Sequence, residues 1–456
     1  MYDVLIKNGR YPDYETMEFV SGDVAIKDGK IVAMGTIEGD ATTVIDASGR
    51  VVSPGFVDIH MHEEWFLKDG FEYEVSNYML QMGVTTCLGG NCGSAHQPID
   101  VFKDTIEKQG GSPVNYMIQA GYNTVRGEMG LSRYEPASEE QIAALAEKMQ
   151  EDLKKGAYGI SFGLEYDPGI TTEEVIAILK TQPQDNLYVS AHYRADSKGA
   201  IQSIHEMVKI AEETGKRFQV SHLSSCSAMG QMDEALEILN KAMMENPKIQ
   251  YDTYPYVAFS CRIGSAVFDD GCFDNWGKSY EDIWVCAGKY KNQFCTKEIF
   301  EELRENDPEQ RVVAFAMNES EIAQAIANPT GCMIGSDGGV SHGAGHPRVA
   351  GTFPRVLGKY VREDQALTLI EALYKMTKVP ADRLELYQKG RMEVGGDADI
   401  TIFDPDTIMD GATFEDLTIK PTGIDYVIVN GQIAMKDNVQ INGRAGKFIP
   451  GPYTVE

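Results

Sequence analysis

The chain has 456 residues, with 69 acidic and 41 basic side chains and a formal net charge of −28 at pH 7. Nucleic acids and anionic membranes are recognised mainly through Lys and Arg, so this charge argues against both as partners. Hydrophobic residues make up 43% of the sequence, which is ordinary for a globular enzyme. The length suffices for a large α/β domain and a smaller second one.

The first residues lack the basic stretch and apolar segment of a secretory signal, and no apolar run approaches the ~20 residues that span a bilayer. Eight cysteines are scattered along the chain without a compact framework, which favours reduced thiols over disulfides. We therefore expect a cytoplasmic protein that binds neither membrane nor nucleic acid. Its oligomeric state is left open.

Both ends of the chain show the alternating apolar and polar residues of short β-strands, separated by Asn-Gly, Asp-Gly and Ser-Gly turns. The segments with this pattern are 2–9, 22–35, 42–55, 396–408 and 424–442. We predict that residues 1–55 and 390–456 together form one small β-sandwich domain.

The middle of the chain alternates strand-like and helix-like segments. Amphipathic helical patterns such as 138–156 and 199–215 lie between many of the expected strands. This rhythm predicts an α/β fold, a parallel (β/α)8 TIM barrel over residues 56–389. The expected strands are 55–62, 83–91, 115–123, 158–166, 187–194, 217–225, 249–256 and 331–339.

The rhythm breaks between the seventh and eighth expected strands, at about residues 261–310. An insertion in a βα loop overhangs the mouth of a barrel, so we predict that this segment caps the site. Its four cysteines are irregularly spaced and include no CxxC pair, which argues against a second zinc site there.

The sharpest chemical signal is the pair His60 and His62 after the first expected strand. Residues two apart on a strand share a face, and barrel enzymes hold their chemistry at the C-terminal ends of strands. His192 and His222 end the fifth and sixth strands, and Asp337 follows the eighth. Imidazoles bind divalent metals, and a carboxylate can bind metal and move protons. These residues predict a metal site.

This arrangement resembles the amidohydrolase superfamily and, within it, the N-acyl-D-amino-acid deacylases (D-aminoacylases). The resemblance implies a zinc-dependent hydrolase that cleaves the amide bond of N-acyl-D-amino acids into a carboxylate and a D-amino acid. It spans nearly the whole chain, and the matching stretches are GFVDIHMHEE, GVTTCLGGNCGSA, GLEYDPG, DTYPYVA, GSDGG and HPRVAGTFPRVLGKYVRE.

The resemblance also implies a set of metal ligands. Cys92 matches a zinc-binding cysteine, which would join His192 and His222 in one tight zinc site. His60 and His62 match a second, weaker metal position. Whether one or two metals are needed is left open.

The same resemblance assigns the remaining roles. Asp337 matches the catalytic carboxylate, which moves the proton of a zinc-activated water. Arg348 matches the arginine that holds the α-carboxylate of the substrate, a task suited to its bidentate fork. Tyr254 and Ser260 match further substrate-binding positions.

Two further residues are candidates by position. Many superfamily members carry a carbamylated lysine after the fourth strand, where this chain has Glu165 and no lysine. Glu165 is a candidate metal ligand, with a substrate contact or a pair with an arginine as alternatives. Arg194 follows His192 by two residues, so we expect it to point into the same mouth as a cationic substrate contact.

Other functions stay open on the same scaffold, because fold alone does not decide function. A cyclic-amide hydrolase is one, although the missing lysine argues mildly against it, and an isoaspartyl-type dipeptidase is another. A non-catalytic binding relative is the alternative of a different class. Such relatives lose metal ligands, whereas every expected ligand is present here.

Overall fold

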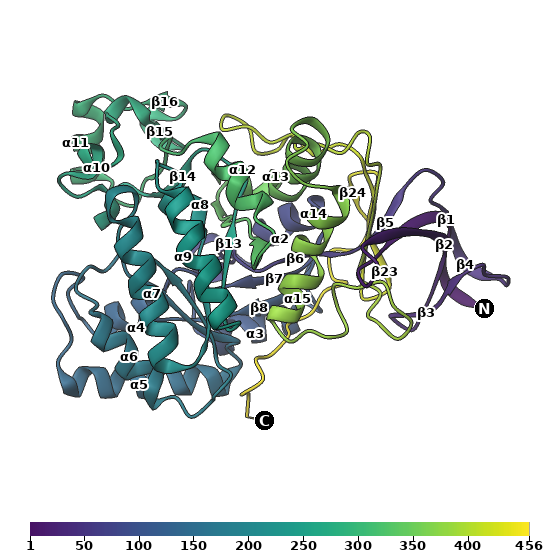
Figure 1. The fold of residues 1–456 in the computed structure, drawn as a ribbon, viewed down its shortest axis with the longest axis horizontal. Coiled ribbons are helices and arrows are strands. Elements are labelled where there is room, and N and C mark those ends of the chain that lie inside the picture. Colours follow the sequence, from purple (N-terminus) through teal and green to yellow (C-terminus); the bar gives the residue numbers. More distant parts are fainter. Residues whose placement is uncertain (456) are drawn as a thin grey trace.

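Strands from both ends of the chain form one nine-stranded sheet in the computed structural model, which describes residues 1–455 (Figure 1). The strand order is β24-β23-β22-β21-β5-β1-β2-β3, with β4 also beside β1. The strands are β1 (Tyr2–Asp13), β2 (Glu18–Lys27), β3 (Lys30–Gly35), β4 (Ala41–Asp46), β5 (Val51–Pro54), β21 (Ile400–Phe403), β22 (Ile424–Val429), β23 (Gln432–Lys436) and β24 (Val439–Gln440).

The turn between β2 and β3 shows why the sequence folds this way locally. Only Asp28 and Gly29 separate the two strands, with φ angles of 51° and 77°. Two-residue hairpins favour positive φ at both positions, and Asp-Gly is a preferred pair there.

The two halves of the sheet meet where β5 pairs antiparallel with β21, from Val51 opposite Phe403 to Pro54 opposite Ile400. The expected union of both termini is therefore present as a sheet.

Two parallel sheets occupy the middle of the chain. Their residues are almost all buried, as in sheets covered on both faces. All eight expected segments contain one of these strands, and 115–123 contains two. The first sheet is β6 (Phe56–Asp58), β7 (Val84–Gly89) and β8 (Asn115–Ile118), and the second is β9 (Ala120–Gly121), β10 (Gly159–Gly163), β11 (Tyr188–His192), β12 (Arg217–Val220), β13 (Ile249–Thr253) and β18 (Cys332–Ile334).

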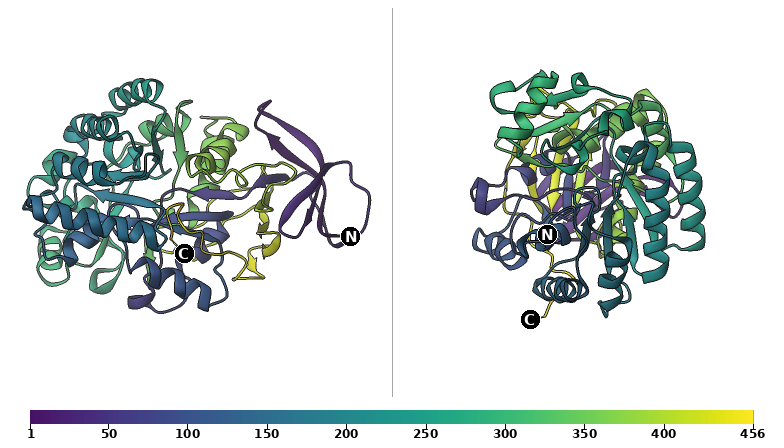
Figure 2. Two further views of the ribbon diagram at one scale, coloured as in Figure 1. Left: turned by 90° about the horizontal axis from the view of Figure 1, so that it is seen from below. Right: turned by 90° about the vertical axis from the view of Figure 1, so that its left-hand side faces the viewer.

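Helices follow these strands and pack on their outer side (Figures 1 and 2). In α5, Ser138 and Gln141 form a capping box at the start, and Leu145, Met149 and Leu153 make the buried stripe. The larger helices are α2 (Val75–Gln81), α3 (Ile99–Lys108), α4 (Tyr122–Glu128), α5 (Glu139–Lys155), α6 (Thr172–Thr181), α7 (Ala200–Thr214), α9 (Met232–Glu245), α12 (Glu319–Ala327), α13 (Arg348–Arg355) and α14 (Leu369–Met376). The shorter ones are α1 (Phe66–Asp69), α8 (Leu223–Ser227) and α15 (Lys378–Arg383).

None of the helices within residues 1–455 combines the length and the apolarity that crossing a membrane requires.

The segment that breaks the rhythm forms a small sheet of its own, with two helices. It contains β14 (Phe259–Arg262), α10 (Cys272–Trp276), β15 (Ile283–Val285), β16 (Gln293–Phe294), α11 (Lys297–Asn306) and β17 (Arg311–Ala314). The strand order is β14-β17-β15-β16, and all pairs are antiparallel. The indole of Trp276 donates to the Asp196 carboxylate at 2.9 Å, which fixes the insertion to the loop after β11. Figure 1 shows it at the upper left.

Phe56 joins the two halves of the molecule, and its loss should be costly. The ring is fully buried at the start of β6 and stacks on Phe353 of α13, with centroids 5.5 Å apart. It also lies 6.4 Å from the Phe403 ring of β21. We expect Phe56→Ala to lower the free energy of unfolding by about 3–5 kcal/mol, because it leaves a cavity. Denaturant unfolding measures this.

The control is Phe71→Ala, at a side chain that is 60% exposed. It should change the free energy of unfolding by no more than about 0.5 kcal/mol. Equal losses in the two variants would contradict a joining role for Phe56.

Candidate metal centre

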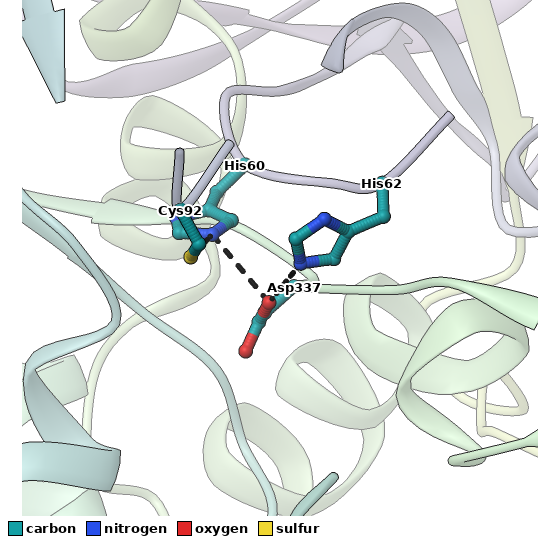
Figure 3. A group of neighbouring side chains, drawn as sticks. All are labelled: His60, His62, Cys92 and Asp337. Atoms are coloured by element: carbon teal, nitrogen blue, oxygen red, sulfur yellow. Dashed lines mark hydrogen bonds and ion pairs between the residues drawn. The ribbon is translucent and has the colours of Figure 1, made fainter. Parts of the chain in front are cut away.

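One group of ligating side chains gathers where β6, β7 and β18 end. His60, His62, Cys92 and Asp337 offer ligand atoms that all lie within 4.8 Å of one another. Figure 3 shows both imidazoles directed at the Asp337 carboxylate. His62 Nε2 lies 3.0 Å and His60 Nε2 lies 3.4 Å from Asp337 Oδ1. The two histidines follow the strand rather than belonging to it, since β6 ends at Asp58.

A second group shares Cys92 and contains His192 at the end of β11 and His222, two residues after β12. Cys92, His192 and His222 meet the same 4.8 Å condition. Cys92 Sγ lies 3.4 Å from His222 Nε2 and 3.3 Å from His60 Nε2, so it stands between the groups. His192 Nδ1 lies 2.9 Å from His222 Nε2. The structure thus brings together all six residues predicted from strand ends and from the resemblance.

The side chains present fit a divalent metal. Thiolate, imidazole and carboxylate are the ligands that zinc takes in proteins. Three of them, Cys92, His192 and His222, are buried. Their ligand atoms point at one another, and each does not point at a hydrogen-bond partner of its own. Electron-rich atoms that converge in a dry interior are costly without a cation between them. The cluster therefore has the chemistry of a metal site.

Each of three histidines is held through its other ring nitrogen. Asp252 Oδ1 lies 3.0 Å from His60 Nδ1, and Glu165 Oε2 lies 2.8 Å from His192 Nε2. For His222 the partner is the Ser225 hydroxyl, at 2.8 Å from Nδ1. Such partners set the tautomer and the ring orientation of metal-binding histidines.

Sequence reasoning missed Asp252 and Ser225. Asp252 also accepts from the His222 backbone N–H at 2.8 Å and from Gln219 at 3.1 Å. The available signal was an aspartate in the middle of a predicted barrel strand, because a buried carboxylate requires several donors. Ser225 lies in α8, directly after the His222 turn, where the sequence alone gives no comparable signal.

Glu165 occupies a different place from that of a metal ligand. Its carboxylate contacts the far nitrogen of His192, and it belongs to neither group of converging ligand atoms among the described residues. The structure therefore supports a site role for Glu165 as the partner of His192.

Arg194 lies outside the site, contrary to expectation. Its guanidinium binds the Glu206 carboxylate on α7 through Nε at 2.9 Å and Nη2 at 2.7 Å. The strand alternation used to place it does not apply, because β11 ends at His192. Beyond that point the chain turns, and Arg194 leaves the face that His192 occupies.

The electrostatics of the cluster favour a thiolate at Cys92 and a carboxylate at Asp337, and they hold on His192 a proton that a bound metal must displace. Burial raises the pKa of the Cys92 thiol, but His60 and His222 beside it hold that pKa well below its usual range. Burial likewise opposes ionisation of Asp337, and Arg348 keeps its pKa well below the usual range. For His192 burial lowers the pKa, while the bonds to Cys92 and Glu165 raise it to about 9.

Three of these residues adopt the left-handed backbone conformation, which is uncommon for residues other than glycine. The φ angles are 55° at Cys92, 36° at His222 and 50° at Asp337. Such strain persists only where the surroundings fix it, and it gathers at functional sites. Backbone bonds fix it here, since Asp337 N–H donates to the His60 carbonyl at 2.7 Å.

The expected substrate residues lie beside Asp337. Arg348 is only 3% exposed, and its Nη1 lies 2.8 Å from Asp337 Oδ2. The guanidinium stands 4.7 Å above the Tyr254 ring, and its Nη2 donates to the Ser260 carbonyl at 3.5 Å. Tyr254 Oη, Ser260 Oγ and Arg348 Nε are buried without a partner among the described residues. A polar ligand is the natural partner for such atoms.

A cavity of about 380 Å³ leads to the cluster and is lined by His62 and Cys92. A second space of about 20 Å³ is lined by His192, His222 and Asp337. Tyr166, which the sequence analysis did not single out, lines both, and its ring lies 4.5 Å from that of His192. Tyr166 therefore lies where the larger cavity borders the space around His192 and His222.

Comparison with known proteins identifies this architecture. Two models of the amidohydrolase family match the chain, one over residues 51–251 and the other over residues 300–435. The chain belongs to the amidohydrolase family. This amidohydrolase is 29% identical to a D-aminoacylase from Alcaligenes xylosoxydans xylosoxydans, over 98% of this chain and 97% of that protein.

Solved structures agree with the sequence relatives. N-acyl-D-glutamate deacylase from Bordetella bronchiseptica, complexed with zinc and a phosphonate inhibitor, superposes with a TM-score of 0.88. The identity is 25%, over 99% of this chain and all of that one. A D-aminoacylase with a binuclear metal centre gives a TM-score of 0.86 at 28% identity, with the same coverage. This amidohydrolase thus lies in the D-aminoacylase branch of its family.

Substitutions of Glu165 test whether it orients His192 or binds the metal itself. We expect Glu165→Gln to bind zinc within about tenfold of the wild type, because the amide oxygen still accepts from His192 Nε2–H. Glu165→Ala should bind zinc about 10–100-fold more weakly, because His192 loses its orienting partner. Competition with a chromophoric chelator measures both.

The matched control is Glu206→Gln, at the nearby glutamate that pairs with Arg194. It should leave zinc affinity unchanged. If Glu165 is itself a ligand, Glu165→Gln will lose as much affinity as His192→Ala.

Proposed function

We propose that this protein is a zinc-dependent hydrolase that cleaves the amide bond of N-acyl-D-amino acids to a carboxylate and a D-amino acid. The observation that carries the proposal is the place of Asp337. Its carboxylate contacts His60 and His62 on one side and Arg348 on the other. The Asp337 carboxylate, which can accept a proton, thus lies between the metal-binding histidines and Arg348, whose guanidinium can bind the carboxylate of a substrate. The D-aminoacylase relatives over nearly the whole chain support the same reaction.

Six residues would hold the metal. We assign one tight zinc site to Cys92, His192 and His222, and a second, weaker position to His60, His62 and Asp337, with Cys92 shared. Bound zinc polarises a carbonyl oxygen and lowers the pKa of water toward neutrality.

Asp337 serves as the general base and then as the general acid. The ion pair with Arg348 keeps its carboxylate charged, and therefore able to accept a proton from the attacking water. His62 Nε2, at 3.0 Å, fixes the orientation of the accepting oxygen. Once protonated, Asp337 donates to the nitrogen of the breaking amide bond. The proton thus passes from the water to the leaving amine.

Arg348 holds the α-carboxylate of the substrate. Its Nε has no protein partner among the described residues, and Tyr254 Oη and Ser260 Oγ nearby are unpaired as well. Together these atoms offer donors on one side of Asp337. Buried arginine is suited to this task because its fork matches a carboxylate.

The architecture that we propose around the site is a closed (β/α)8 barrel. Its two parallel sheets adjoin at both sides: only Gln119 separates β8 from β9, and Met61 forms a parallel bridge with Gly338 beyond β6 and β18. In this description residues 56–389 are the barrel, 261–310 its cap, and 1–55 with 390–456 the small β-sandwich domain.

Replacing the base should stop turnover without loss of metal. We expect Asp337→Asn to retain zinc at Cys92, His192 and His222, while kcat falls by about 10²–10⁴-fold because proton transfer is lost. Zinc content and amine release from N-acetyl-D-amino acids measure the two effects. Asp270→Asn, at an exposed aspartate of the insertion, is the control and should behave as wild type. Full activity of Asp337→Asn would refute this role.

The substrate class needs a panel of N-acetyl-D- and N-acetyl-L-amino acids, isoaspartyl dipeptides and cyclic amides. Turnover confined to the D-series supports the proposed function. Turnover of only dipeptides or rings would assign the same metal site to a different amide hydrolase.

A further inference from the structure

The cavity has a cationic wall away from Arg348. Arg262 on β14 and Arg311 on β17 face each other directly in the antiparallel pairing of the insertion. Both line the cavity of about 380 Å³ that His62 and Cys92 also line. Like charges directly opposite each other on paired strands are destabilising. The protein therefore maintains a repulsive pair at the entrance to its metal centre.

The two arginines differ in how their charges are balanced. Arg262 pairs with Glu309 at 3.1 Å on the surface. The Arg311 guanidinium makes no ion pair or side-chain hydrogen bond with any residue from 1 to 455, although the side chain is half-buried. Burial and the charges of Arg262 and Arg348 lower the pKa of Arg311 from its ordinary value. Its guanidinium thus has no carboxylate in direct contact among the described residues, although Glu309, which pairs with Arg262, and Asp167 line the same cavity.

Arg311 is also close to the metal ligands. A Cβ placed on Gly339 would lie 3.8 Å from Arg311 Nη2 and 3.1 Å from the Cβ of His62. The guanidinium and His62 therefore flank the same glycine, two residues after Asp337. A substrate whose amide reaches Asp337 can reach Arg311 with another part of its structure.

We propose that Arg311, with Arg262 beside it, binds a second anionic group of the substrate, so that the preferred substrates are N-acylated D-amino acids that carry two carboxylates. The inference rests on the proposed function. One carboxylate pairs with Arg348 and the other with Arg311. In a protein with a net charge of −28, a dianion needs dedicated cations, because the general field repels it.

The second carboxylate has two possible sources, the amino-acid side chain or the acyl group. Arg133 at the same cavity does not decide between them, because it is exposed and donates to the Gly264 carbonyl at the rim. The shared chemistry is a carboxylate separated from the α-carboxylate by a short chain. Matched substrate pairs separate the two sources.

The test compares kcat/KM for acidic substrates and their neutral isosteres. N-acetyl-D-glutamate is set against N-acetyl-D-glutamine, and N-succinyl-D-alanine against N-succinamoyl-D-alanine. We expect the zinc-loaded enzyme to prefer the acid in one pair by at least about tenfold, which identifies the source. Arg311→Met should lower kcat/KM for that acid by about 10–100-fold and leave its neutral isostere within about threefold.

Two further variants test whether the effect comes from the charge of Arg311 and from its position. Arg311→Lys should recover part of the activity on the acid, because it keeps the charge but loses the fork. Arg10→Met removes the same charge from an exposed position on β1, where the guanidinium only covers the Phe19 ring, and should change nothing. Zinc content confirms that each variant folds.

The outcomes separate the two proposals. Hydrolysis of the neutral and acidic members of both pairs at equal rates would overturn the inference and leave the proposed function standing. So would an equal loss on both members of a pair in Arg311→Met. No turnover of any N-acyl-D-amino acid would overturn both proposals.

Discussion

The structure depends on gathering four imidazoles, a thiol and a carboxylate in a nearly dry space. Left alone, such groups repel or lose hydrogen bonds to water, and a cation is what makes their convergence favourable. The surrounding protein is arranged to hold the rings still until that cation arrives. Asp252 is central to this, because one carboxylate fixes the His60 ring and the backbone at His222. Glu165 and Ser225 fix the other two rings.

The backbone contributes as much as the side chains. Cys92, His222 and Asp337 all turn sharply, with positive φ, where strand direction is lost. Each turn bends its side chain back over the strand ends instead of out into solvent. The strained residues follow buried parallel strands, and this rigid surrounding structure keeps the strained conformations in place. Arg348 and Asp337 then compensate each other's charge in the same enclosed region.

Much of this followed from sequence, for identifiable reasons. Strands with apolar interiors and histidines at their ends locate the metal site, because parallel strands bring their C-terminal ends together. The roles of residues beyond the strand ends were harder to predict. Arg194 was misplaced because periodicity stops at His192. Asp252 and Tyr166 act through contacts between elements distant in sequence, which no single segment reveals. Ser225 contacts His222 only three residues earlier, but it does so through the turn of α8, which the residue types alone do not mark. Arg311 was overlooked because its position opposite Arg262 depends on strand pairing within the insertion, whose irregular pattern does not predict that pairing.

Because β5 pairs with β21, its edge stays open until residue 403 has left the ribosome, and the terminal sheet is complete only after residue 440. During most of synthesis Val51–Pro54 present an unpaired apolar edge, joined to β1 only at Val51 opposite Arg10. Unpaired edges are templates for pairing with other chains. Domains generally fold from the N-terminus as they emerge, so this one must wait for its last strands. The nascent protein is therefore most exposed to aggregation, and most in need of chaperones, late in its own translation.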